Sequence, residues 1–203
     1  MHTELVLGTC NPAKVRYLRG ILAQVGVSLR GAQEWDLALD VAETGGTAQE
    51  NARLKAVAFA ERLGRTVLSM DNALYLGGLP ANEQPGLHVR RIGPGAVRAS
   101  DQQVLEHYAR IVDRQGGVVE GHWEFGLALA GPEGPIADTV VMSPCRWMSP
   151  PSPRRTEGYP LESIQVDPVS GRHLVDLDSE ARDALWRQSM GASLIRFIQE
   201  HLP

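Results

Sequence analysis

The stretch that decides the fold is ELVLGTCNPAK, from Glu4 to Lys14. Its apolar part, Glu4–Gly8, is typical of a short buried strand. Pro12 suits the first position of a helix, and apolar residues follow it at helical spacing until Gly26, a typical stop signal. The stretch therefore predicts a strand, a polar turn and a helix, which is the opening of an α/β domain.

Strands and helices continue to alternate through the first half of the chain. Thr47 and Glu50 stand three residues apart before an alanine-rich stretch, a pattern typical of a helix capping box. We expect this helix to end at Gly64, and a buried strand to follow over residues 66–70 with Asp71 at its carboxyl end. The remaining segments predict a strand and a loop (residues 27–42) and a long loop rich in Gly and Pro (residues 72–95).

The second half predicts a helix, a β-hairpin and a final helix. Ser100 and Gln103 mark a helix start, and two apolar runs around the sequence GPEGP indicate the hairpin. The whole pattern favours an α/β fold with a central mixed sheet flanked by helices. We treat residues 1–203 as a single domain and expect a ligand in a cleft between its two halves. The expected ranges are 118–130 and 136–147 for the hairpin, 148–160 for a proline-rich loop and 179–201 for the last helix.

Composition excludes several classes of protein. The formal net charge of -4 argues against a nucleic-acid polymer as the partner, because such a partner requires a basic surface. The sequence contains no run of about 18 apolar residues, so it predicts no membrane-spanning helix. The first residues lack the pattern of a signal peptide. The two cysteines, Cys10 and Cys145, are too few for a disulfide framework or a zinc site. We therefore expect a reduced, cytoplasmic protein that does not bind membranes.

The turn from Thr9 to Lys14 is the first candidate for ligand binding. A turn before a helix presents free backbone N–H groups and the positive end of the helix dipole. Thr9 and Asn11 add hydrogen-bonding groups and Lys14 adds a positive charge, so the turn could hold a phosphate group. The alternative is structural: Thr9 or Asn11 only caps the helix and Lys14 lies in solvent.

The segment from Glu43 to Lys55 is the second candidate. Glu43 precedes the expected helix, and Glu50 and Asn51 lie in its first turn. Magnesium in proteins typically uses one or two carboxylates together with substrate phosphates, and Lys55 could neutralise a phosphate. The alternative is that an acidic first turn and a later lysine merely stabilise the helix.

Asp71 and the turn from Pro85 to Arg91 complete the set of candidates. A carboxylate at the carboxyl end of a strand is well placed to orient or deprotonate a water molecule near a metal. The turn ends in two arginines, which suit bidentate phosphate binding. The alternatives are a turn cap for Asp71 and a solvated basic pair at the arginines.

Taken in order, these four blocks resemble the inosine triphosphate pyrophosphatase family. The family pattern T-G-N-x-x-K is matched by Thr9, Asn11 and Lys14. The pattern E-x-G-x-T-x-x-x-N-A-x-x-K-A is matched by Glu43, Gly45, Thr47, Asn51, Ala52, Lys55 and Ala56. D-D-S-G-L aligns with residues 70–74, and P-G-x-x-S-A-R is matched by Pro85, Gly86 and Arg91.

The resemblance implies an elongated mixed sheet in two lobes with a central cleft, often in a homodimer. It implies magnesium-dependent hydrolysis of a nucleoside triphosphate, such as one with a non-standard purine, to the monophosphate and pyrophosphate. Glu43 and Asp71 would serve the metal, and Asp71 and Lys55 would take part in catalysis. The implied substrate-binding residues are Thr9, Asn11, Lys14, Asn51, Asn72, Arg91, Tyr159 and Arg187.

The sequence departs from the family pattern at several positions. Met70 replaces the first aspartate of the family's pair, and Glu50 is the nearest carboxylate that could compensate. Asn72 and Ala73 replace the serine and glycine that follow the pair. The metal could therefore be bound more weakly, or by another ligand.

The base-recognition blocks differ most. The family's F-G-[YW]-D-P block is reduced to Gly158 and Tyr159, and its S-H-R block falls in the region 186–191, where Arg187 could match the arginine. Trp147, Trp186 and Tyr159 could stack on a base or could belong to the core, so the sequence does not identify the base.

These departures leave two further hypotheses besides the enzyme. The chain could be a nucleotide-binding pseudoenzyme or regulatory protein that kept the phosphate-binding residues and lost turnover. It could also act mainly as a subunit or scaffold.

Overall fold

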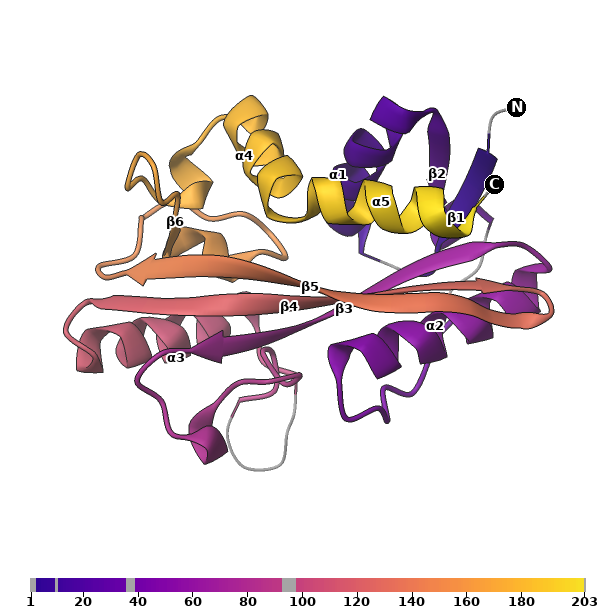
Figure 1. Cartoon of the computed structure of the whole chain (residues 1–203). Coiled ribbons are helices and arrows are strands. Elements are labelled where there is room, and N and C mark those ends of the chain that lie inside the picture. The colour runs from indigo at the N-terminus through magenta and orange to yellow at the C-terminus, as the bar shows by residue number, and fades with distance from the viewer. Residues whose placement is uncertain (1–2, 10, 36–38, 93–97, 203) are drawn as a thin grey trace. The chain divides into compact units, whose positions relative to one another are not determined.

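The structure is a computed structural model that describes residues 3–9, 11–35, 39–92 and 98–202 (Figure 1). Cys10 of the predicted turn and residues 93–95 of the expected loop 72–95 lie outside the described residues. The chain divides into two compact units. Unit 1 comprises residues 1–72, 124–142 and 186–203, and unit 2 comprises residues 73–123 and 143–185. None of the described helices is long and apolar enough to cross a membrane.

Six strands form one mixed sheet in the order β2-β1-β3-β4-β5-β6. β1 pairs in parallel with β2 and with β3, whereas β5 and β6 are antiparallel. A two-residue turn joins β4 to β5, as expected for the predicted hairpin. The α/β fold class with a mixed sheet is therefore confirmed. The strands are β1 (Thr3–Leu7), β2 (Val27–Gly31), β3 (Val67–Leu76), β4 (Val118–Gly131), β5 (Gly134–Met148) and β6 (Gln165–Val166).

Helices α1 (Pro12–Leu22) and α2 (Ala48–Leu63) of unit 1 begin and end as predicted. α1 continues into a short 3-10 turn that ends at Gly26, and α2 ends at Gly64; both glycines have positive φ. The Thr47 side chain accepts a hydrogen bond from the Glu50 N–H, as in a capping box. The Glu50 carboxylate, however, accepts from the N–H of Gly46, one residue before Thr47.

Small side chains bring α2 close to the strands of unit 1. Ala52 and Ala56 of α2 pack with Ala128 and Ala130 of β4 in a buried cluster that also holds Phe59. At Gly126 of β4, an added Cβ would lie 2.3 Å from the carbonyl carbon of Ala48. Figure 1 shows α2 on one side of these strands, and α1 and α5 (Ala192–His201) on the other.

Strand β3 differs from the expectation. The strand predicted over residues 66–70 continues to Leu76, so Asp71 lies in mid-strand and not at its carboxyl end. The first residues of the expected loop 72–95 are therefore strand, because Leu74 and Leu76 are buried and the backbone of Leu74 pairs with Gly86. The polar residues at positions 71 and 72 caused the error, since Asp and Asn are depleted in strands.

The final helix is helical throughout residues 179–201, as expected, but it is not uniform. α4 (Ser179–Trp186) and α5 are joined by a π-helical segment, Arg187–Gly191. Such segments are rare and occur frequently at functional sites. Arg187, one of the predicted substrate-binding residues, is the first residue of this segment.

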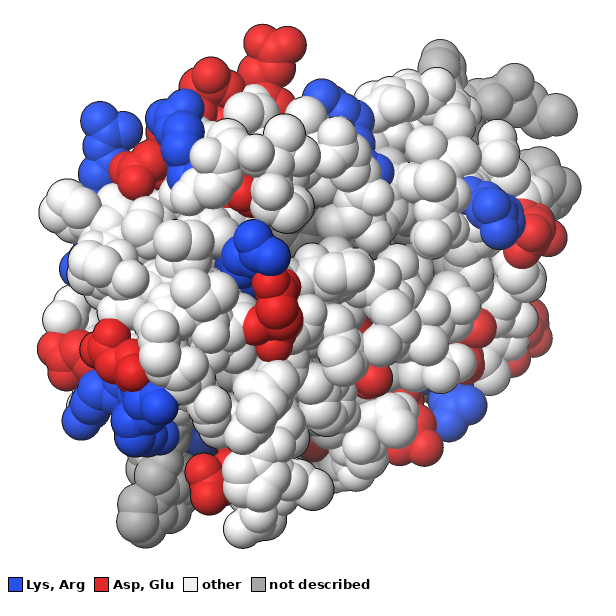
Figure 2. Space-filling model, turned by 60° about the vertical axis from the view of Figure 1, so that its left-hand side comes forward, with Lys and Arg blue, Asp and Glu red and all other residues white. Residues whose placement is uncertain are grey.

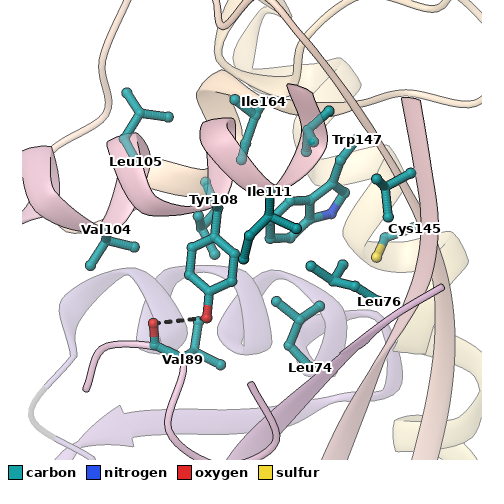
Figure 3. Packing of buried hydrophobic residues seen from close by; sticks show 13 residues of the cluster. Leu74, Leu76, Val89, Val104, Leu105, Tyr108, Ile111, Cys145, Trp147 and Ile164 are labelled. Atoms are coloured by element: carbon teal, nitrogen blue, oxygen red, sulfur yellow. Dashed lines mark hydrogen bonds between the residues drawn. The ribbon is translucent and has the colours of Figure 1, made fainter. Parts of the chain in front are cut away.

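Unit 2 has its own hydrophobic core beneath α3 (Asp101–Arg114), whose predicted capping box between Ser100 and Gln103 is present. Trp147 is fully buried there and meets the edge of the Tyr108 ring at 5.3 Å between centroids. Figure 3 shows the Tyr108 hydroxyl donating to the Val89 carbonyl. Trp147 is therefore a core residue and does not stack on a base.

The surface carries charges of both signs. On the face drawn in Figure 2, Lys and Arg lie beside Asp and Glu at several places, and large areas between them are uncharged. Ion pairs among the described residues include Arg90 with Asp101 and Arg146 with Glu120. The small net charge of the chain thus reflects mixed surface charges.

Replacing Gly126 by alanine tests the close contact between β4 and α2. The new methyl group would overlap the Ala48 backbone, so we expect Gly126→Ala to lower the free energy of unfolding by about 2 kcal/mol or more. Gly131→Ala in the same strand is the matched control, because its added Cβ would make an ordinary contact of 3.6 Å. Urea unfolding measures both variants, and equal midpoints for the two would contradict the contact.

Candidate active site

Four charged side chains from separate segments of unit 1 converge at one place. Lys55 of α2 lies between two carboxylates: its Nζ is 3.1 Å from Glu43 Oε1 and 2.8 Å from Asp71 Oδ1. Lys14 of α1 reaches the same part of β3, where its Nζ donates to Asn72 Oδ1 at 3.0 Å and to the Met70 carbonyl at 3.3 Å. The residues predicted from three sequence blocks therefore meet in the folded chain.

The parallel pairing of β1 with β3 positions Lys14. The Gly8 N–H donates to the Leu68 carbonyl, and the Ser69 hydroxyl donates to the Gly8 carbonyl, so the end of β1 lies beside β3 just before Asp71. The turn that follows leads directly into α1, whose first turn carries Lys14. The pairing of β1 with β3 therefore fixes the position of the Lys14 backbone.

Within the turn, the side chains of Thr9 and Asn11 bind the backbone. Thr9 Oγ1 accepts from the Asn11 N–H, and Asn11 Oδ1 accepts from the Lys14 N–H at 3.4 Å. These contacts are those of the structural alternative, a helix cap. Any contact of Thr9 and Asn11 with a substrate stays a prediction.

Asn51 holds the loop that carries Glu43. Its side chain is buried, and its Oδ1 accepts from the Gly45 N–H at 2.8 Å. Gly45 has to be a glycine here, because an added Cβ would lie 2.7 Å from the Cβ of Glu50. Asn51, predicted to bind substrate, therefore holds the loop that carries Glu43. The Glu50 carboxylate holds the same loop, because it accepts from the Gly46 N–H.

The surroundings of Lys14 lower its pKa from 10.5 to about 8. Burial is the main cause and the charge of Lys55 is the second, while Asp71 and Glu43 act in the opposite direction. The four groups thus influence one another electrostatically. With both lysines protonated, the two cations and two anions together carry no net charge.

The other predicted residues lie elsewhere in the chain. Arg187 is exposed on the π-helical segment of unit 1, whereas Arg91 and Tyr159 belong to unit 2. Trp186 stacks on Tyr17 of α1 with ring centroids 4.8 Å apart, which packs one face of its indole. A role of Trp186 or Tyr159 at a base stays a prediction.

Of the two arginines that end the turn, the sequence led us to choose Arg91, whereas the structure gives defined side-chain partners to Arg90. Arg91 is exposed and pairs through its backbone with Arg98, whereas the half-buried Arg90 forms an ion pair with Asp101. Arg90 also donates to the Gly158 carbonyl, and Asp101 accepts from the Gly158 N–H. The pair therefore fixes the turn that leads to Tyr159. Two adjacent arginines give no sequence signal for choosing between them.

The described residues contain no group of three or more His, Cys, Asp or Glu side chains arranged to hold a metal ion. Glu43 and Asp71 remain as a pair around Lys55. Cys145 is buried, and burial raises the pKa of its thiol to about 12, so this thiol is not a ready metal ligand or nucleophile.

Solved structures of low sequence identity share this fold. The Ham1 protein of Staphylococcus aureus has a TM-score of 0.71 and the HAM1 protein of Coxiella burnetii one of 0.72. Each is 22% identical, and each match covers 98% of this chain and 99% of the solved chain.

Curated relatives extend the similarity to sequence. The dITP/XTP pyrophosphatase of Streptomyces coelicolor is 33% identical, over 90% of each chain, and that of Geobacillus kaustophilus is 30% identical, over 90% of this chain and 87% of the relative. A dITP/XTP pyrophosphatase of Streptococcus pyogenes is 28% identical over 98% of this chain, which spans 58% of that longer protein. The model of the Ham1 family matches residues 5–120, which include the four sequence blocks. The chain therefore belongs to the Ham1 family, as the resemblance of its four sequence blocks indicated.

Proposed function

We propose that this chain is a pyrophosphatase that hydrolyses a nucleoside triphosphate to the monophosphate and pyrophosphate. The observation that carries the proposal is the convergence of Lys14, Lys55, Glu43 and Asp71 in unit 1. The names of the curated relatives, all dITP/XTP pyrophosphatases, support it. These relatives are named as enzymes, so they give no support to the alternative of a binding protein without turnover.

The two lysines would bind the triphosphate. Lys14 and Lys55 reach the site from two helices, and their ammonium groups can approach phosphate oxygens from different directions. Asn72 holds Lys14 and can donate its amide N–H₂ to a phosphate, and the turn of Thr9 and Asn11 offers the N-terminus of α1. Arg91, Tyr159 and Arg187 are proposed to contact the rest of the nucleotide.

Glu43 and Asp71 are proposed to hold a magnesium ion. The ammonium of Lys55 lies between their oxygens, and this supports the proposal because a positive charge is already compensated there. Magnesium commonly uses one or two protein carboxylates together with phosphates and water. The four charged groups cancel one another, so a divalent ion would provide the net positive charge that a polyanion requires. When bound, magnesium would polarise phosphate oxygens and offset the charge that develops on them.

Asp71 is proposed as the general base. The oxygen of a water molecule would attack the α-phosphorus. The anhydride bond between the α- and β-phosphates would break, and pyrophosphate would leave with the bonding electrons. The water proton would pass to the Asp71 carboxylate. Lys55, which contacts Asp71 at 2.8 Å, would stabilise the negative charge on the phosphates during this step.

The proposals for the base of the substrate, the oligomeric state and the location rest on the relatives and on the family resemblance. We propose a substrate with a non-standard purine, because the relatives are named for dITP and XTP. Trp186 at the end of α4 and Arg187 in the π-helical segment would then determine how the base is held. A homodimer in the cytoplasm is proposed on the same resemblance.

A panel of standard and modified nucleoside triphosphates with magnesium tests the reaction. We expect pyrophosphate release from at least one of them, and a fall of kcat by about 100-fold or more in Asp71→Asn, because general bases contribute at least this factor. The exposed Glu61 of α2 provides the control variant Glu61→Gln, which should keep the wild-type rate. An unchanged rate in Asp71→Asn would show that the base is misassigned. Binding of nucleotides without release of pyrophosphate from any of them would favour the binding protein.

The lowered pKa of Lys14 predicts a decline of activity in alkaline solution. Protonated Lys14 attracts phosphate, so raising the pH through about 8 removes its charge and weakens substrate binding. We expect kcat/KM to fall above that pH by up to about tenfold per pH unit, since this ratio reports groups of the free enzyme. Arginine stays charged in this range, so Lys14→Arg should lose the decline. A pH profile of kcat/KM that is identical in this variant would assign the decline to another group.

A further inference from the structure

Lys55 occupies the place between the two carboxylates of the site. Its Nζ contacts Glu43 Oε1 at 3.1 Å and Asp71 Oδ1 at 2.8 Å. The side chains of Lys55 and Asp71 are each 14% exposed, so water screens their interaction only in part. The lysine neutralises half of the negative charge of the pair.

Lys14 has a different arrangement at the same site. Its described side-chain hydrogen bonds go to the Met70 carbonyl and to the amide oxygen of Asn72, and not to a carboxylate. One lysine therefore lies beside the carboxylate pair, and the other lies between its members. Comparing the two lysines therefore distinguishes two effects on metal binding. One is the presence of a positive charge in the site, and the other is occupation of the place between the carboxylates.

We propose that Lys55 is an internal counter-ion that blocks the metal site of the ligand-free protein and leaves it when a nucleotide binds. The inference rests on the proposed function, because it assumes that Glu43 and Asp71 bind the metal. It adds an order to the binding: the metal ion and the polyphosphate enter together, and the metal alone binds weakly.

Electrostatics gives the reason for this order. A divalent ion bound by both carboxylates would be close to the ammonium of Lys55, and like charges at short distance in a partly buried site repel strongly. The long, flexible side chain of lysine allows its ammonium to move toward an incoming phosphate oxygen. Because coupling between two ligands is reciprocal, a nucleotide that draws Lys55 away strengthens metal binding, and the metal strengthens nucleotide binding.

The exchange of Lys55 for the metal ion matters in this chain because of the residue at position 70. The side chain of Met70 is buried and apolar, so it offers no carboxylate to the metal. The two carboxylates and the lysine between them together carry a net charge of about -1. This charge attracts a lone divalent ion only weakly. Removing the lysine charge restores the full charge of both carboxylates.

Binding of Mn²⁺ without nucleotide tests the proposal. Electron paramagnetic resonance of free Mn²⁺ gives the dissociation constant of the wild type and of Lys55→Met. We expect Lys55→Met to bind Mn²⁺ at least about tenfold more tightly, because a neighbouring positive charge is lost. Lys55→Arg keeps the charge and should bind as weakly as the wild type. Glu43→Gln added to Lys55→Met should remove the gain.

Lys14→Met is the matched control for charge alone. It removes a positive charge from the same site but leaves Lys55 between the carboxylates, so we expect a clearly smaller gain in Mn²⁺ affinity. Equal gains in Lys14→Met and Lys55→Met would overturn the proposal, as would a wild type that already binds Mn²⁺ as tightly as Lys55→Met.

Thermal unfolding provides a second readout that also shows whether Lys55→Met folds. Without metal, this variant has two unpaired carboxylates and should unfold at a lower temperature than the wild type. Mn²⁺ should raise its Tm more than it raises the wild-type Tm, because a ligand that binds only the folded state stabilises it. If Lys55→Met does not fold, Lys55→Gln, which keeps a hydrogen-bond donor, replaces it in the same measurements.

These results are independent of turnover. The proposed function would stand if the wild type hydrolyses a triphosphate while Lys55→Met shows no gain in Mn²⁺ affinity; only the exchange would then be wrong. Tight Mn²⁺ binding by Lys55→Met in a protein that hydrolyses no nucleotide would support the exchange and reject the enzyme.

Discussion

The two ion pairs of Lys55 are the interaction on which the candidate site depends. They join helix α2, the loop before it and strand β3 through one nitrogen atom. A half-buried ammonium between two carboxylates compensates charges that would otherwise repel each other, and it holds Glu43 and Asp71 near a common point. Breaking such a pair on one side leaves an uncompensated charge, which costs more than the pair itself contributes. The geometry of the site is thus maintained by the same charges that are proposed to perform the chemistry.

The packing of α2 determines whether Lys55 can reach both acids. The alanines of α2 and Gly126 of β4 let the helix lie directly against the strand backbone. The buried Asn51 then fixes the preceding loop through the Gly45 N–H. On the other side, the parallel pairing of β1 with β3 brings Lys14 in the first turn of α1 to Met70 and Asn72. Small residues and backbone hydrogen bonds therefore set the positions of side chains that are far apart in the sequence.

Much of the fold, and the set of charged residues that meet in unit 1, could be predicted from the sequence. Helix caps, glycine stops and the hairpin depend on neighbouring residues, and the structure has them where the sequence indicated. The extension of β3 past Asp71 could not be predicted in this way, because burial of Leu74 and Leu76 outweighs the low strand propensity of Asp and Asn. The role of Arg90 was also hidden, since its partners Asp101 and Gly158 are distant in sequence.

The proposed function makes different demands on the residues that meet the phosphates and on those that meet the base. A triphosphate presents the same charges whatever its base, so the groups proposed to hold it need only charge and position, and the two lysines and two acids that meet in unit 1 offer both. A base is selected by ring stacking and by hydrogen bonds to its edges, which depend on the exact side chains. In this chain the region of the family's base-reading block is a π-helical segment whose preceding Trp186 packs against Tyr17. Helix α1 links this segment to the four charged groups, because it carries both Tyr17, which stacks on Trp186, and Lys14.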